Sequence, residues 1–201
     1  MYNDYWNDGQ DAGSTPARYT YGERIEMIIL RTITGSRLHG TDHENSDYDF
    51  FTVVTDDIKT KSTTSPIEDN VIMSYSTFSE LVRKGSPKEL EALFSQKKEV
   101  SNPILESLHP VTGKAVDRFL NVIVGNIVRD KYLKTQRHAI RLSLHISDFL
   151  EFGFFNPTLS PAQLDTVLIR AKMDRDELIR YVVDQALNYD LHEEFYGRLG
   201  G

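Results

Sequence analysis

The pattern of apolar and polar positions in the first half of the chain predicts β-strands. Ile28 to Thr34 is rich in β-branched residues, Asp47 to Thr55 (DYDFFTVVT) combines β-branched and aromatic residues, and Val71 to Ser76 (VIMSYS) is similar. Such side chains suit a pleated, half-buried surface, so each segment predicts a strand. The pattern from Tyr21 predicts a short helix that merges into the first of these strands.

From residue 86 onward the apolar positions follow helical spacing instead. In GSPKELEALF, Ser86 is a candidate N-cap, Pro87 falls on the first helical position, and Glu89 follows the cap at the spacing of a capping box. A helix is therefore predicted to begin at Pro87.

The second half of the chain continues with long helical patterns. One begins at about Thr112 and resumes through residues 131–152, and a last one runs from Ser160 to about Asn188 with a break near residues 172–175. The apolar stripe of the first pattern is typical of a buried helix face. It comprises Val116, Phe119, Leu120, Ile123, Ile127 and Val128.

This succession predicts an α+β fold: a small mixed sheet with helices, followed by a helical C-terminal half. Residues 1–20 are rich in Asn, Asp, Gly, Ser and Pro without any period, and predict a flexible N-terminal tail. Residues 21–110 predict the core that carries the sheet, and residues 111–201 a helical region that packs over its site. The polar TKSTTS segment, residues 60–65, is interpreted as a loop.

Composition narrows the class of protein. The 201 residues, 39% of them apolar and 26% charged, suffice to bury a core. The sequence has no cysteine, which excludes disulfides, thiolate zinc sites and thiol nucleophiles. Without a long apolar run or a charged-then-apolar leader, it predicts a cytoplasmic protein with no membrane partner. A net charge of −7 argues against broad binding to duplex DNA, so any phosphate site must be local.

A polar run, GSRLHGTDHENSDYDFF, separates the first two predicted strands. Asp47 and Asp49 are two positions apart on a strand and share a face, with Tyr48 directed oppositely, toward the core. Two converging carboxylates repel each other unless a cation lies between them, and their hard oxygens suit Mg²⁺ or Mn²⁺. Gly35 and Ser36 offer a closely approachable backbone and a hydroxyl to phosphate oxygens. Together these residues predict a nucleotide and metal site.

The polar run has three other interpretations besides a nucleotide and metal site. A solvated acidic turn is the usual explanation of an isolated Asp-x-Asp, but the Gly-Ser pair and the flanking apolar strands favour a site. A calcium loop starting at Asp42 fails because its sixth position is Asp47, not glycine, and its twelfth is Val53, not glutamate. His39 and His43 make a poor zinc site, because no glutamate base follows His39. Both histidines are interpreted as loop residues.

The order of these elements, an apolar strand, GSRLHG, a spacer and SDYDFF, resembles the signature of the DNA polymerase β-like nucleotidyltransferase superfamily. It looks most like the bacterial and phage subgroup described as predicted nucleotidyltransferases. The segment Leu81-Val82 and then KGSPKELEALFS is also similar to that subgroup, with Ser86 where asparagine is usual. The resemblance covers most of residues 27–175. Its last matching positions are Lys134, His138, Ala139, Arg141 and Leu142.

The resemblance implies a metal-dependent enzyme that transfers a nucleoside monophosphate from an NTP to an acceptor hydroxyl and releases pyrophosphate. Asp47 and Asp49 would bind two Mg²⁺ or Mn²⁺ ions. The acceptors in the superfamily include RNA ends, tRNA among them, protein hydroxyls and small molecules, and the sequence selects neither an acceptor nor a base. The alternative is a catalytically lapsed module of the same fold that binds a nucleotide or RNA without turnover.

The resemblance also implies a third catalytic carboxylate on the strand after the Asp pair. The VIMSYS segment contains no acid, and Glu68 and Asp69 lie just before it. If the strand extends backward, Asp69 shares a face with Val71 and Met73, so Asp69 is preferred to Glu68. Two loop acids, and hence no third carboxylate, is the alternative.

Basic residues supply the last candidate group. Lys134, His138 and Arg141 are spaced to share one helix face, and Arg137 lies beside them. A solvated surface is the usual explanation of such a cluster. A net acidic protein that holds a triphosphate needs nearby cations, however, so these three residues predict phosphate or acceptor binding. His138 can equally be a hydrogen-bonded structural histidine.

Overall fold

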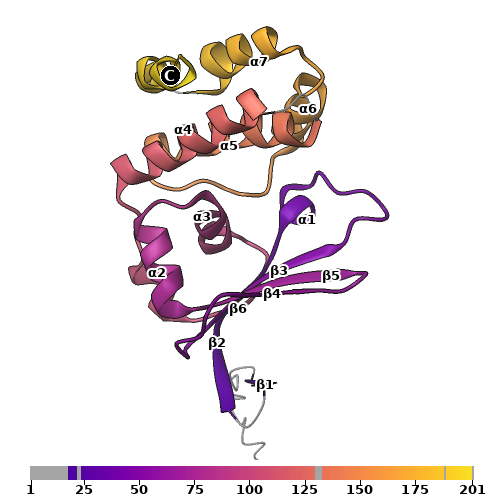
Figure 1. Ribbon diagram of the computed structural model, residues 1–201, viewed down its shortest axis with the longest axis vertical. Coiled ribbons are helices and arrows are strands. Elements are labelled where there is room, and N and C mark those ends of the chain that lie inside the picture. Colours follow the sequence, from indigo (N-terminus) through magenta and orange to yellow (C-terminus); the bar gives the residue numbers. More distant parts are fainter. Residues whose placement is uncertain (1–17, 22–23, 130–132, 188, 201) are drawn as a thin grey trace, which may run out of the picture.

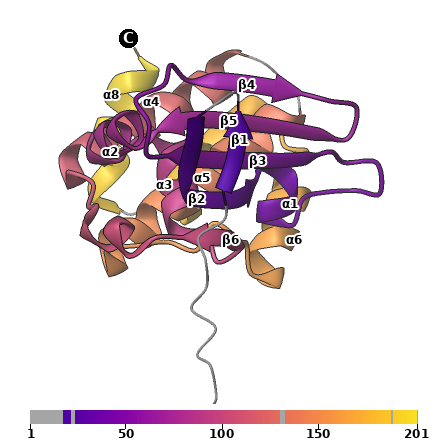
Figure 2. The same cartoon turned by 90° about the horizontal axis from the view of Figure 1, so that it is seen from below.

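The computed structural model describes residues 18–21, 24–129, 133–187 and 189–200, and its architecture is α+β. Figure 1 shows the sheet below, helices α2 (Tyr75–Arg83) and α3 (Pro87–Phe94) above it, and the helical C-terminal half at the top. Seen from below, the sheet lies in front of the helices (Figure 2). The predicted fold class, a mixed sheet followed by a helical C-terminal half, is confirmed.

Within the described residues the sheet has six strands, in the order β1-β2-β3-β5-β4, with β6 paired to β2. The β3–β5 pair is parallel and the other pairs are antiparallel. The parallel register places Asp49 opposite Asp69. The strand bounds are β1 Arg18–Tyr21, β2 Arg24–Thr34, β3 Tyr48–Val54, β4 Lys61–Thr64, β5 Glu68–Ser74 and β6 Lys98–Ser101.

The helices begin with the short α1, Gly35–His39, directly after β2. In the second half, α4 and α5 lie side by side and the later helices pack against them (Figure 1). Their bounds are α4 Thr112–Arg129, α5 Leu133–Phe152, α6 Pro161–Arg170, α7 Arg175–Tyr181 and α8 His192–Leu199, with 3₁₀ turns at Pro103–Ser107 and Tyr189–Leu191 and a π turn at Val182–Ala186.

The two halves share one hydrophobic core. Phe51 and Phe78 from the sheet half and Phe119 from the helical half are fully buried in the same cluster. Gly85, between α2 and α3, allows the close packing, since a Cβ there would lie 2.2 Å from the Cα of Ala115 on α4. No helix among the described residues is long and apolar enough to cross a membrane.

The N-terminal prediction is wrong where the structure describes it. The segment predicted to begin a short helix at Tyr21 instead lies in two paired strands: Tyr21 ends β1, and residues 24–27 begin β2, with Tyr21 opposite Arg24 and Arg18 opposite Met27. Pairing between the two strands outweighs the local helical pattern. The predicted tail, residues 1–20, therefore overlaps a strand at residues 18–20, and residues 1–17 lie outside the described residues.

Two predictions around β5 and α3 also need correction. The strand begins at Glu68 rather than Val71, and the TKSTTS segment read as a loop pairs with it as β4. Helix α3 starts at Pro87 as predicted, but Ser86 makes no side-chain cap hydrogen bond, so the capping box is wrong. Glu89 is buried instead of reaching back to the cap.

The helical half follows the sequence pattern more closely. Ser160 caps α6 in a capping box with Gln163, and the predicted break lies between α6 and α7. Val128, predicted in the buried stripe of α4, is 49% exposed because it lies in the last turn of that helix.

Candidate functional site

Three carboxylates meet at one edge of the sheet. Asp47 precedes β3, Asp49 is its second residue, and Asp69 is the second residue of β5. One oxygen of each lies within 4.8 Å of the other two. Side chains alternate along a strand, so the neighbouring Glu68 is directed to the other face, where its carboxylate lies 3.7 Å from Arg31. The structure thus brings Asp69, not Glu68, to the Asp pair.

Gly35 permits this arrangement. Strand β2 ends opposite Asp49, and the chain turns at Gly35 with a positive φ of 65°. A Cβ at this position would lie 1.9 Å from Oδ2 of Asp49. Only glycine leaves room for that carboxylate, and it also adopts this backbone conformation at little cost. The sequence predicted that Gly35 lets a ligand approach, whereas its first effect is to admit Asp49.

Arg37 holds the loop that carries Asp47. Its Nε donates to the carbonyl of Asp47 at 3.0 Å, another nitrogen donates to the carbonyl of Ser46, and a third lies 3.5 Å from the carboxylate of Asp42. Its guanidinium also stacks over Tyr48, 3.9 Å from the ring centroid. Tyr48 does face away from the acids, but it is 45% exposed, so its predicted position in the core is wrong.

The acids repel one another in the absence of a cation. Partial burial, followed by the charges of Asp47 and Asp69, raises the pKa of Asp49, while Lys88 and Lys134 oppose that shift. Three oxygen ligands at this separation suit a hard divalent cation such as Mg²⁺ or Mn²⁺. The residues present therefore fit the metal that the sequence predicts.

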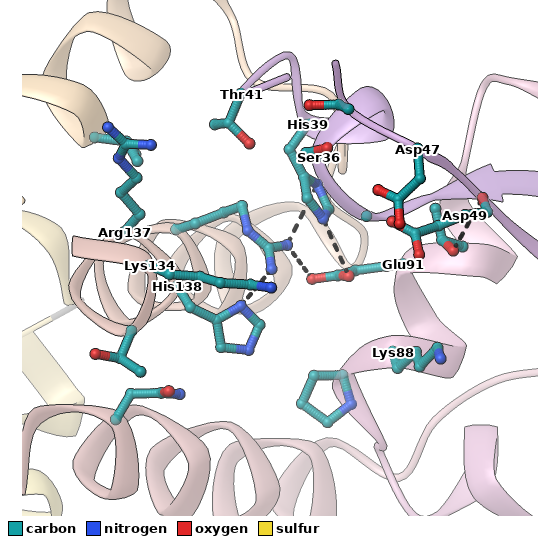
Figure 3. Close-up of a pocket in the computed structure, with 18 of the residues that line it drawn as sticks. Ser36, His39, Thr41, Asp47, Asp49, Lys88, Glu91, Lys134, Arg137 and His138 are labelled. Carbon is teal, nitrogen blue, oxygen red and sulfur yellow. Dashed lines mark hydrogen bonds and ion pairs between the residues drawn. The ribbon is translucent and has the colours of Figure 1, made fainter. Parts of the chain in front are cut away.

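A cavity of about 1040 Å³ opens beside the acids, between the sheet half and α4 and α5. Gly35, Ser36, Asp47 and Asp49 form part of its lining, whereas Asp69 does not line it. Figure 3 shows Asp47 and Asp49 on one side and Lys134, Arg137 and His138 on the other. The lining joins residues far apart in the sequence.

Three cations that line the cavity are available to a ligand. The sequence predicts a phosphate-binding role for Lys134, on α5, and identifies Arg137 only as its neighbour. The role of Lys88, on α3, is not predicted from the sequence. Among the described residues none of the three forms an ion pair. A phosphate-bearing ligand in this cavity would therefore meet the positive charges of Lys88, Lys134 and Arg137.

Arg141 differs from these cations because its charge is already balanced. It is 6% exposed, and its guanidinium pairs with the buried carboxylate of Glu91 on α3. Burial opposes ionisation of Glu91, but Arg141 and the nearby histidines outweigh it and lower the pKa of Glu91. Of the predicted basic face, Lys134, His138 and Arg141 all line the cavity, but Arg141 has no free charge for a phosphate.

The structure contradicts the interpretation of His39 as a loop residue. It lies in α1 rather than a loop, and it is 5% exposed. Its Nδ1 lies 2.9 Å from the carbonyl of Pro157 and its Nε2 3.5 Å from the carboxylate of Glu91. Burial and the charge of Arg141 lower the pKa of His39 to about 3. His43 is exposed in the loop, as predicted.

The acid cluster predicts a stabilising effect of divalent cations. We expect Mn²⁺ or Mg²⁺ to raise the melting temperature, because a bound cation removes the repulsion among Asp47, Asp49 and Asp69 and stabilises only the folded state. Differential scanning fluorimetry with and without the metal measures the shift. The variant Asp69→Asn should reduce it and Glu68→Gln should not. Equal shifts in both variants would contradict the assignment of Asp69.

Comparison of the sequence with models of known protein families and with curated proteins finds no match to this chain.

Proposed function

We propose that this protein is a metal-dependent nucleotidyltransferase, which transfers a nucleoside monophosphate from an NTP to an acceptor hydroxyl. The observation that carries the proposal is the meeting of Asp47, Asp49 and Asp69 beside a cavity whose lining includes three cations that form no ion pair within the described part of the chain. An acidic turn without a ligand would not need three carboxylates brought together from two separate segments of the chain. The resemblance of the sequence to the DNA polymerase β-like superfamily points the same way.

The position of the third acid favours an enzyme over a lapsed binding module. A binder can hold a nucleotide–metal complex with the Asp pair alone, whereas the resemblance implies a third carboxylate for the acceptor hydroxyl. Asp69 lies opposite Asp49 in the β3–β5 register and is within metal reach of the pair. This placement supports turnover and not binding alone.

In the proposed reaction the acceptor hydroxyl releases its proton to solvent and its oxygen forms a bond to the α-phosphorus. The bond from that phosphorus to the oxygen that bridges to the β-phosphorus breaks, and pyrophosphate leaves. Divalent cations held by the carboxylates would lower the pKa of the acceptor hydroxyl and neutralise charge on the leaving group. Ser36 and Gly35 would position the phosphates in line. Lys88 and Lys134 would stabilise the negative charge of the phosphates during transfer.

The proposal is tested by incubating the protein with each of the four α-labelled NTPs, Mg²⁺ or Mn²⁺, and in turn total RNA, total protein or a small-molecule extract. We expect label to pass from one NTP to one class of acceptor, with release of pyrophosphate. Saturable NTP binding without transfer in any combination would favour the binding module. Absence of both binding and transfer would contradict the proposal.

The positive charges of Lys88 and Lys134 lead to a separate prediction about NTP affinity. Lys88→Met and Lys134→Met keep the apolar stem but remove the charge, so each should weaken binding of a non-hydrolysable NTP with little effect on stability. A charge-assisted phosphate contact is worth about 1.5–3 kcal/mol, which corresponds to roughly a tenfold loss or more. Isothermal titration calorimetry measures the affinity.

Arg180→Met is the matched control, because Arg180 is exposed on α7 and does not line the cavity. It should leave NTP affinity unchanged. A loss in the control equal to that in the lysine variants would show that the effect is one of overall charge.

A further inference from the structure

Glu91, on α3, lines the cavity and contacts side chains from α1 and α5. Its carboxylate, 7% exposed, accepts a hydrogen bond from Arg141 on α5 and lies 3.5 Å from Nε2 of His39 on α1 and 3.7 Å from Nδ1 of His145 on α5. Figure 3 marks the contact between Glu91 and His39 with a dashed line. A buried ion pair of this kind contributes little net stability compared with apolar packing. Its directional contacts therefore suggest a role in placing the side chains around it.

Arg141 carries the effect of Glu91 to the cavity. One guanidinium nitrogen donates to Glu91 and another lies 2.6 Å from Nδ1 of His138. A guanidinium has only donors, so Nδ1 of His138 must accept this hydrogen bond. Because Glu91 fixes the guanidinium, it also fixes which nitrogen of His138 carries no proton.

The consequence for His138 is a single tautomer. Burial and Arg141 lower the pKa of His138 to about 4, so the ring is neutral near pH 7. With Nδ1 accepting from Arg141, the proton of the neutral ring lies on Nε2. Nε2 makes no hydrogen bond with any residue in the described part of the chain, and the ring lines the cavity.

We propose that Glu91 is a positioning residue that acts through Arg141 to hold His138 as the Nε2–H tautomer, a neutral hydrogen-bond donor for a ligand in the cavity. His138 then offers a donor to a phosphate or acceptor oxygen and cannot act as a base through that nitrogen. The ligand-binding part of this inference rests on the proposed function, and the tautomer itself does not.

The tautomer is tested directly by NMR. Two-bond ¹H–¹⁵N correlations of histidine-labelled protein distinguish protonation at Nδ1 from protonation at Nε2, and comparison with the His138→Gln spectrum assigns the signal. We expect wild-type His138 to be neutral and protonated at Nε2 at pH 7. A wild-type signal from the Nδ1–H tautomer or from a charged ring would overturn the proposal without any further variant.

The role of Glu91 is tested by removing the ion pair. The double variant Glu91→Gln/Arg141→Met leaves no unpaired buried charge, so we expect it to fold and to show a mixture of His138 tautomers. Glu91→Asp, which keeps the carboxylate, should restore much of the Nε2–H population relative to Glu91→Gln. Retention of a pure Nε2–H signal in the double variant would show that another contact sets the tautomer.

Binding of a non-hydrolysable NTP with Mg²⁺ supplies the functional readout. A glutamine amide can take the place of an Nε2 donor and an asparagine amide cannot, so His138→Asn should lose about three- to tenfold more affinity than His138→Gln. Equal losses would overturn the donor role. If the wild type binds no NTP, the proposed function fails while the NMR result still decides the role of Glu91.

Arg198→Met is the control for a purely structural effect. Arg198, on α8, pairs with Asp117 on α4 and with Glu194 on its own helix, and it does not line the cavity. The change should lower the melting temperature and leave both the His138 tautomer and NTP affinity unchanged. A change of tautomer in this variant would attribute the signal to general loosening of the helices and overturn the role of Glu91.

Discussion

Replacing Asp49 with asparagine is expected to abolish nucleotidyl transfer and to raise the melting temperature of the metal-free protein. Loss of one preorganised polar group at a reaction centre costs about 10²–10³-fold in rate, and Asp49 supplies one of the three oxygens of the cluster that it forms with Asp47 and Asp69. Turnover of the labelled NTP identified for the wild type measures the first effect. Scanning fluorimetry without metal measures the second.

The stability effect of Asp49→Asn should depend on pH. The pKa of Asp49 is raised in the folded protein, so its ionised form is disfavoured there relative to the unfolded chain. The cost is complete above the folded pKa and disappears as pH falls below the unfolded pKa. The variant should therefore melt higher than the wild type near pH 7, and the difference should vanish toward about pH 4.

Asp165→Asn is a suitable control, since Asp165 is exposed on α6 and lies outside the cavity. It should keep wild-type activity and show no gain in metal-free stability. An Asp49→Asn protein with wild-type turnover would contradict the whole assignment of the active site.

Gly35→Ala is expected to have almost as large an effect, although it removes no functional group. The new methyl carbon would lie 1.9 Å from Oδ2 of Asp49, so the carboxylate must move away from Asp47 and Asp69. The Mn²⁺-dependent rise in melting temperature should be largely lost, together with transfer. Both are measured by the assays described above.

Gly153→Ala is the control that separates the steric clash at Gly35 from backbone strain. Gly153 has a similar positive φ of 76°, and a Cβ there would meet no atom within 4 Å. Gly153→Ala should therefore cost only the strain of a left-handed residue, about 1–2 kcal/mol, and leave metal binding intact. Equal loss of metal binding in both variants would show that the Gly35 effect does not act through Asp49.

The sequence predicted the parts of the fold and site whose pattern is local. The strand around Asp49, the start of α3 at Pro87 and the cap of α6 at Ser160 are visible within a few residues of sequence. Strand β1 was missed because its pairing partner, not its own composition, makes it a strand. From the sequence, Asp69 could be proposed only on the assumption that the strand begins before Val71. The structure shows this extension, because Asp69 pairs with Asp49 in the β3–β5 register.

The missed residues of the site depend on contacts across long stretches of the chain. Glu91 pairs with Arg141, which is fifty residues later in the chain, and it also contacts His39 from α1. No spacing rule links such positions. The sequence therefore predicted phosphate binding for Arg141 without its pairing to Glu91, and it placed His39 in a loop. Lys88 was overlooked for a similar reason, because only the packing of α3 beside the acids brings its charge near Asp49.

The parallel pairing of β3 with β5 also limits how this chain can change in length. Because side chains alternate along a strand, a shift of β5 by one residue would exchange Asp69 for Glu68 or Asn70 on the acid face. Insertions and deletions between β3 and β4 leave that alternation intact and can be absorbed by the turn. Homologous chains should therefore vary in length before β4 and keep Asp69 at a fixed distance from the residues that follow it in β5.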